Sequence, residues 1–198
     1  MSAAAAAGTW KLGDLEVNRI GYGTMRLTGN GMMGNSDGPP IDREAAVRLL
    51  HSAFEQGVDH VDTAAFYFSP LRSANELLNR ALSSWRGDVV VVTKVGPTRA
   101  PSGDWLYRGG PDQLRGQVEE NLRQLGRDHL DVVNLRVNGP RTPSVAEHFG
   151  ALAVHRGPQV LAIPGTANPA HLRENIAAGA LRLTEEELAV LNGQGMPR

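Results

Sequence analysis

The sequence predicts an α/β protein whose strands run parallel and are joined by helices. Apolar runs typical of buried strands alternate along the chain with segments that carry apolar residues at helical spacing. Strand, helix, strand, helix is the order of parallel strands joined by right-handed crossovers. Two architectures have this order, a (β/α) barrel and an open doubly wound sheet.

Composition supports a globular domain and narrows the classes of function. The chain has 198 residues, of which 41% are hydrophobic and 21% charged, and a formal net charge of -1. This balance argues against a nucleic-acid partner, and no run reaches the roughly 20 apolar residues that cross a bilayer. Without cysteine there is no disulfide or thiol nucleophile, and the histidines lack metal-ligand spacing. We therefore expect a cytoplasmic protein with no membrane partner and no metal site.

The N-terminal part predicts a tail, a hairpin and a loop. Residues 1–9 are small and only weakly apolar, so we expect a disordered tail followed by a single domain over residues 10–198. Residues 10–20 alternate around a Gly-Asp pair, which predicts a small β-hairpin. Residues 28–40 are rich in Gly, Asn and Pro and predict a loop.

Beyond the hairpin the pattern becomes regular and predicts five strands that alternate with helices, with one further helix at the end. The strands are expected at residues 18–24, 58–62, 88–94, 130–136 and 159–163. The helices are expected at residues 41–57, 73–85, 110–126, 144–153, 168–179 and 183–193. Their ends carry typical signals: Asp42 as an N-cap, Gly57 as a stop, Pro111 in a first turn and Gly126 at an end.

Polar residues follow three successive strands, at the end where chemistry collects in either architecture. Asp62 ends one strand, Lys94 the next, and Asn134 and Arg136 the third. A lysine in an apolar strand is costly unless it is paired, and Asp62 is the natural partner. Tyr67 follows within reach of Lys94, whose ammonium would lower the pKa of the phenol. A tyrosine so tuned can protonate a carbonyl oxygen while a hydride arrives.

These motifs resemble the aldo-keto reductases. "GYGTMRL", "VDTAAFY", "VVTKVG" and "VLAIPGTANPAHLREN" stand in the order of that family. The resemblance implies a TIM-type (β/α) barrel closed at the bottom by a short hairpin, and reduction of aldehydes and ketones with NADPH. It also implies that Asp62, Tyr67 and Lys94 are three of the four catalytic residues, with Tyr67 as the proton donor.

The resemblance extends to a cofactor site. "IPGT" followed by "HLREN" resembles the segment that holds the adenosine 2′-phosphate. Its carried-over contact positions are Gly165, Thr166, His171, Glu174 and Asn175. Those near the nicotinamide are Gly23, Thr24, Met25 and Asp62.

Arg136 is one departure from the family, whose fourth catalytic residue is usually a histidine. The sequence resembles a bacterial subgroup that also reads "DVVNLRV" and is associated with pyridoxal reduction. Our hypothesis is that Arg136 stabilises negative charge on the carbonyl oxygen or binds an anionic group of the substrate. The alternative is that Arg136 only neutralises Asp62 or Asp131.

The number of strands is the second departure. A full barrel needs eight strands and typically about 250 residues, whereas five strands are recognised here. After about Ala153 the sequence resembles the segment that precedes the last strand of the family. We therefore expect an internal deletion of about three βα units at this point. In the family that part supplies a Ser-Asn pair, a Gln and an aromatic residue that hold the nicotinamide. The remaining sheet would have two unpaired edges, which favours self-association.

Other interpretations stay open beside the reductase. One is a catalytically inactive truncated remnant, at most a weak nucleotide- or partner-binding protein. Another is a doubly wound dehydrogenase, but "GYGTMR" keeps only Gly21 and Gly23 of the expected G-x-G-x-x-G. Asp62 and Lys94 would, in the simplest alternative, form a purely structural ion pair.

Overall fold

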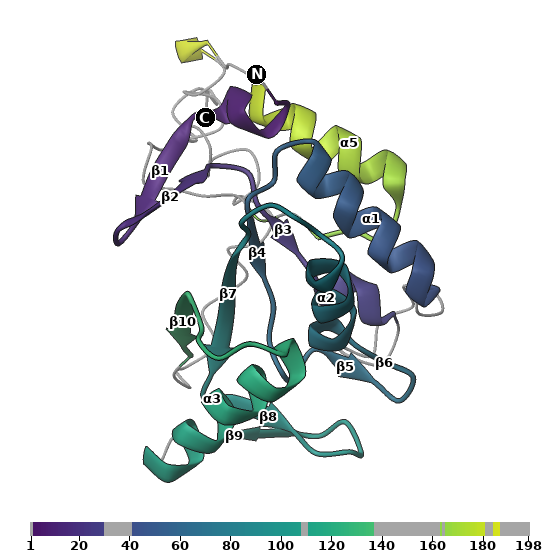
Figure 1. Cartoon of the computed structure of the whole chain (residues 1–198), viewed down its shortest axis with the longest axis vertical. Coiled ribbons are helices and arrows are strands. Elements are labelled where there is room, and N and C mark those ends of the chain that lie inside the picture. The colour runs from purple at the N-terminus through teal and green to yellow at the C-terminus, as the bar shows by residue number, and fades with distance from the viewer. Residues whose placement is uncertain are drawn as a thin grey trace, which may run out of the picture.

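A parallel four-stranded sheet forms the centre of the molecule, with the strand order β10-β7-β4-β3 (Figure 1). The computed structural model describes residues 2–29, 41–107, 111–136, 163, 165–180 and 184–186. The strands are β3 (Tyr22–Gly23), β4 (His60–Asp62), β7 (Val90–Val95) and β10 (Val132–Leu135). Each neighbouring pair is parallel, as the alternation of strands and helices predicted.

The sheet confirms the first four predicted strands, although each one is shorter than its apolar run. The fifth predicted strand lies outside the described residues except for Ile163, as do most or all residues of the helices predicted at 144–153 and 183–193. Within the described part of the chain the sheet stays open, with β3 and β10 at its edges. The architecture is that of a (β/α) barrel which these four strands do not close.

Four α-helices share one hydrophobic core with the sheet. They are α1 (Arg43–Glu55), α2 (Ala74–Ser83), α3 (Pro111–Leu125) and α5 (Pro169–Ala177). Leucines from all four helices pack with Tyr22, Val61 and Val91 of the sheet. Since β-strand side chains alternate between faces, this core occupies one face, and Asp62 and Lys94 point to the other.

The helix ends follow the signals in the sequence. Asp42 accepts a hydrogen bond from the backbone N–H of Ala45 at 3.1 Å, which confirms the predicted N-cap of α1. Gly57 and Gly126 follow α1 and α3 with φ angles of +91° and +63°, which L side chains rarely adopt. α3 begins at Pro111, as predicted.

At the N-terminus the hairpin is confirmed, but the disordered tail is not. β1 (Thr9–Leu12) and β2 (Leu15–Asn18) pair antiparallel around the predicted turn. Before them, η1 (Ala4–Ala7) is a 3-10 helix whose Ala4 and Ala7 are buried. Alanine side chains are small enough for this close packing, yet a run of alanines carries no hydrophobic periodicity that would predict it.

Short elements complete the described chain. They are η2 (Met25–Thr28), β5 (Phe68–Ser69), β6 (Arg72–Ser73), β8 (Pro97–Arg99), β9 (Trp105–Tyr107) and η3 (Ala178–Ala180). β5 pairs with β6, and β8 with β9, as two antiparallel hairpins beyond the carboxyl ends of β4 and β7. None of the helices in the described ranges has the length and hydrophobicity that crossing a bilayer requires.

Replacement of Leu50 tests how α1 packs against the sheet. Leu50 is fully buried in the shared core, so Leu50→Ala should lower the free energy of unfolding by about 3 kcal/mol. Leu71→Ala is the matched control, because that leucine is 63% exposed and should change the stability little. Urea unfolding of both variants measures the difference; equal losses would contradict the packing described here.

Candidate active site

A buried ion pair joins the carboxyl ends of β4 and β7. The ammonium of Lys94 donates a hydrogen bond to Oδ1 of Asp62 and another, at 3.1 Å, to the backbone carbonyl of Thr63. Asp62 is only 6% exposed. The two strands are hydrogen-bonded neighbours, so their parallel register brings the two side chains together as the sequence predicted.

The pKa of Asp62 reflects a balance between burial and nearby cations. Burial is the largest influence and raises the pKa of this carboxyl above its ordinary value. The charge and hydrogen bond of Lys94 lower the pKa, and His60 and Arg136 add smaller contributions in the same direction. The carboxylate form of Asp62 therefore depends on Lys94.

Tyr67 lies against this ion pair. The Nζ atom of Lys94 is 4.8 Å from the centroid of the Tyr67 ring, and the tyrosine is 7% exposed. The backbone N–H of Tyr67 donates to the carbonyl of Ala64 at 3.0 Å, and its carbonyl accepts from Ala74 at 2.9 Å. These bonds fix the turn after β4, so the phenol is held beside an ammonium within a mostly buried site.

Arg136 directly follows β10 at the same end of the sheet. Its backbone N–H donates to the carbonyl of Val95 at 2.9 Å, which continues the pairing with β7. Its side chain is exposed, and its charge lowers the pKa of Asp62. Asp131 is occupied elsewhere, by Arg127 at 2.8 Å and His129 at 3.2 Å. Of the two carboxylates considered for Arg136, Asp131 thus has other cationic partners, and Asp62 is the one whose pKa Arg136 affects.

A small pocket opens on the face of the sheet that carries the ion pair. It measures about 210 Å³ and is lined by Gly23, Met25, Arg26, Asp62, Tyr67, Ile163 and Gly165. The segment at residue 165 approaches the end of β3 so closely that a side chain is excluded on both sides. A Cβ atom on Gly23 would lie 2.9 Å from the carbonyl oxygen of Ile163, and one on Gly165 would lie 2.6 Å from that of Gly23.

The predicted cofactor positions divide between this pocket and α5. Gly23, Met25, Asp62 and Gly165 line the pocket. Thr24 instead is fully buried and bonds the backbone of Asp62. Thr166 is also buried, and its backbone carbonyl accepts a hydrogen bond from the hydroxyl of Tyr22.

Three predicted positions form one face of α5 outside the pocket. His171 and Glu174 are exposed and Asn175 is half-buried, at helical spacings of three and four residues. They follow the N-terminus of α5, where Asn168 caps the helix by accepting from the backbone N–H of Ala170 at 2.8 Å. The helix therefore presents a polar face next to a capped N-terminus.

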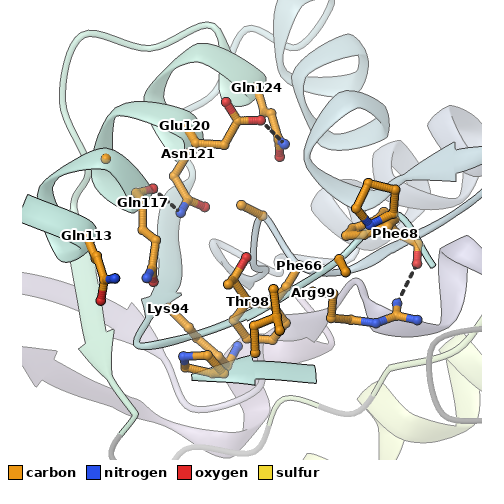
Figure 2. Close-up of a pocket in the computed structure, with 16 residues that line it drawn as sticks. Phe66, Phe68, Lys94, Thr98, Arg99, Gln113, Gln117, Glu120, Asn121 and Gln124 are labelled. Atoms are coloured by element: carbon orange, nitrogen blue, oxygen red, sulfur yellow. Dashed lines mark hydrogen bonds between the residues drawn. The ribbon is translucent and has the colours of Figure 1, made fainter. Parts of the chain in front are cut away.

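A larger pocket of about 630 Å³ lies beside the ion pair (Figure 2). Its walls come from α3, β8 and the segment around Phe66 and Phe68, and Lys94 is the one member of the ion pair that lines it. Asp62 and Tyr67 do not face it. Of these two pockets, the smaller one is lined by both Asp62 and Tyr67.

Some residues of the site carried no signal that sequence reasoning used. Thr63 accepts a hydrogen bond from Lys94 through its backbone, and Tyr22 holds the segment at Thr166. Burial raises the pKa of Tyr22, which keeps that phenol protonated as a donor. Thr63 could have been found in the sequence as a polar residue directly after Asp62. Tyr22 could not, because in the sequence it looks like any aromatic residue of the core. Among the described residues no group of histidines and carboxylates could hold a metal ion.

Comparisons with known proteins point in one direction. The profile of the aldo/keto reductase family matches residues 19–156. Pyridoxine 4-dehydrogenase of Escherichia coli is 30% identical over 287 residues, which cover 95% of this chain and 98% of that protein. Because those 287 residues exceed the length of this chain, the alignment contains a large gap.

Two further relatives extend the comparison. An uncharacterized oxidoreductase of Schizosaccharomyces pombe is 37% identical over 140 residues, 71% of this chain but only 44% of that protein. The crystal structure of an aldo-keto reductase from Klebsiella pneumoniae in complex with NADPH superimposes with a TM-score of 0.65 at 19% identity, over 90% of this chain and 91% of that one. At that identity the structural likeness shows the fold alone.

Removal of Lys94 tests the electrostatic balance at Asp62. A carboxyl group whose pKa is higher in the folded state stabilises the fold while protonated, and this stabilisation is lost as the pH rises. Without Lys94 the pKa of Asp62 should rise further, so Lys94→Met should lose stability relative to the wild-type chain as the pH rises from about 4, where a free carboxyl titrates, towards neutral, by up to about 3 kcal/mol. Urea unfolding across this range measures the effect.

Lys11→Met is the control for that experiment, because Lys11 is the only other lysine of the chain and is exposed on β1. It should change stability little and equally at each pH. A constant offset between Lys94→Met and the wild-type chain would show that the ion pair is not linked to the ionisation of Asp62.

Proposed function

Because the chain belongs to the aldo/keto reductase family, a family of oxidoreductases, we propose that it reduces an aldehyde or ketone with NADPH. The observation that carries this proposal is the contact between Asp62, Lys94 and Tyr67 beside one small pocket. A purely structural ion pair would not need a phenol held against the ammonium, facing a pocket of about 210 Å³.

In the proposed reaction each of the three residues has its own part. NADPH, when bound, supplies the hydride that reduces the carbonyl carbon. Tyr67 donates its phenolic proton to the carbonyl oxygen, which becomes the hydroxyl of the product. Lys94 stabilises the phenolate that remains, and Asp62 holds Lys94 in place.

Cofactor binding would use both groups of predicted positions. The nicotinamide ring would enter the small pocket beside Asp62 and Tyr67. Gly23 and Gly165 allow the two backbone segments that line this pocket to meet, and Met25 lines it with them. The polar face of α5 would hold the adenosine 2′-phosphate end. Thr24 and Thr166 would act from behind by fixing the two segments.

We further propose a pyridoxal-like substrate. The relative that matches across 98% of its own length is a pyridoxine 4-dehydrogenase, whose name describes chemistry between an alcohol and an aldehyde on a pyridine ring. Arg136 supports this proposal, because its exposed guanidinium lies at the same end of the sheet as the ion pair and its charge reaches Asp62. Such a guanidinium can stabilise a developing oxyanion or bind an anionic group.

The alternative, a catalytically inactive remnant, is favoured by the open sheet. The four described strands leave two edges, and the gap in the alignment is consistent with a deletion near Ala153. In that case the chain would bind a nucleotide or a partner weakly, or self-associate through its edges. For either function we propose a cytoplasmic location, because a chain without cysteine fits a reducing compartment.

Titration with NADPH followed by turnover of pyridoxal tests the main proposal. The wild-type chain should quench or shift NADPH fluorescence saturably and then reduce pyridoxal. Tyr67→Phe should keep the NADPH affinity but lower kcat by about 10³-fold, since the proton donor is lost while the ring remains. Absence of NADPH binding by the folded wild-type chain would favour the inactive remnant.

Tyr22→Phe serves as the matched tyrosine variant. It removes the hydroxyl that holds the carbonyl of Thr166 and leaves the proton donor untouched. It should therefore raise the Kd for NADPH more than it lowers kcat, the opposite of Tyr67→Phe. The same pattern from both variants would contradict the separate parts given to the two tyrosines.

Replacement of Arg136 tests its proposed part in the reaction. Arg136→Ala should reduce kcat/KM for pyridoxal by about 10²-fold if the guanidinium stabilises the oxyanion. Arg86→Ala is the control, because Arg86 is also an exposed arginine but lines neither of the two pockets described above. A loss of less than about twofold for Arg136→Ala would reject the proposal, because one such donor is worth far more.

A further inference from the structure

A chain of buried hydrogen bonds lies behind the ion pair, on the helix side of the sheet. It begins at the two threonines next to the reacting residues in sequence, Thr63 beside Asp62 and Thr93 beside Lys94. The hydroxyl of Thr63 donates to Oδ1 of Asn75 at 2.7 Å. The hydroxyl of Thr93 donates to Oδ1 of Asn121 at 2.6 Å.

The two asparagines bond to each other. Nδ2 of Asn75, on α2, donates to Oδ1 of Asn121, on α3, at 3.1 Å. Thr63, Thr93 and both asparagines have no solvent exposure. The ends of β4 and β7 are therefore connected through two helices by a continuous path of four side chains, which we call the asparagine bridge.

The remaining hydrogen-bonding groups of the bridge also have partners. Nδ2 of Asn75 additionally donates to Gln124 at 3.0 Å. Nδ2 of Asn121 donates to the carbonyl of Gln117 at 2.8 Å, as Figure 2 shows. On the β3 side, the hydroxyl of Thr24 lies 3.0 Å from that of Thr63. A satisfied buried network of this kind specifies one arrangement, because any shift leaves a buried polar atom unpaired.

We propose that Asn75 and Asn121 are positioning residues, which fix the spacing between Asp62 and Lys94 by holding the ends of β4 and β7 from behind. Elsewhere α1 and α2 pack on the sheet through leucines such as Leu50 and Leu77. The polar contact is placed at the strand ends that carry the ion pair, and Thr63 itself accepts a hydrogen bond from Lys94. The effect of this positioning role on catalysis rests on the proposed function, whereas its effect on Lys94 does not.

The lysine content of the chain gives a direct test that needs no activity. Lys11 and Lys94 are the only lysines, so a chain labelled with ¹⁵N-lysine gives two side-chain signals by NMR. The ammonium protons of Lys94 should exchange slowly with water, because they are bonded to Asp62 and Thr63. Those of the exposed Lys11 should exchange fast and provide an internal reference.

Three variants separate positioning from packing. Asn75→Ala removes the centre of the bridge, and Thr93→Val removes one hydrogen bond while keeping the shape of the side chain. Asn79→Ala is the matched control: Asn79 lies one turn further along α2 and also donates to α3, at the carbonyl of Gln124, 3.4 Å away, but touches neither strand end.

Asn75→Ala and Thr93→Val should each accelerate the exchange of the Lys94 ammonium by about tenfold or more, and Asn79→Ala by less than about twofold. Unchanged exchange in Asn75→Ala and Thr93→Val would overturn the proposal. Equal acceleration in Asn79→Ala would also overturn it, because the contact between α2 and α3 would then be responsible. Fast exchange of the Lys94 ammonium protons in the wild-type chain would also overturn it, because the spacing between Asp62 and Lys94 would then not be fixed.

Turnover of pyridoxal by the same variants distinguishes this inference from the proposed function. Asn75→Ala and Thr93→Val should lower kcat and leave KM for NADPH unchanged, while Asn79→Ala should lower neither. If the wild-type chain is inactive but Lys94 exchanges slowly and responds to the bridge variants, the reductase proposal fails and the positioning role stands. If the wild-type chain is active and the bridge variants leave Lys94 unchanged, the reverse holds.

Discussion

An ammonium group at the end of an apolar strand needs a partner, and much of this site follows from that requirement. Lys94 follows a run of valines and Thr93 in β7, so its charge would be buried at high cost without a carboxylate beside it. Asp62 meets the need because β4 and β7 are parallel neighbours: it is in register with Val92, two positions before Lys94 and on the same face of the sheet. The same pair then places a cation against Tyr67, where it can influence a phenol. One electrostatic requirement thus links the topology of the sheet to the chemistry proposed for it.

Local patterns predicted the parts of the structure that local physics decides. Apolar runs identified four of the parallel strands, and Asp42, Gly57 and Gly126 marked helix ends through their own backbone preferences. Asp62, Tyr67 and Lys94 were recognisable because charged or phenolic side chains are unusual at the ends of buried strands. The sheet order then brought them together, as expected from the general rule that chemistry collects at these ends.

What the sequence did not reveal depends on partners that are distant along the chain. Asn75 and Asn121 lie 46 positions apart, and each one alone resembles the solvated polar face of an amphipathic helix. The prediction of a disordered tail was wrong at η1 for a different reason. Uniform small side chains give no hydrophobic periodicity, even though Ala4 and Ala7 are buried. The sequence offered two carboxylates as partners of Arg136, and it could not show that one of them, Asp131, pairs with Arg127 and His129.

The hydrogen bond from Tyr22 to the carbonyl of Thr166 spans 144 positions of sequence, whereas Asp62, Lys94 and both asparagines lie within residues 62–121. Loop-closure entropy rises slowly with the span of a contact, so the contact across 144 positions costs about 1 kcal/mol more than those across 32 and 46 positions. We therefore expect the chain to fold in two stages: the unit of β4, α2, β7 and α3 forms early, and the segment from Gly165 through α5 docks on β3 late. The late segment carries the residues assigned to the adenosine end of the cofactor. A ligand bound there would stabilise the segment that folds last and unfolds first, because it binds only when this segment is docked.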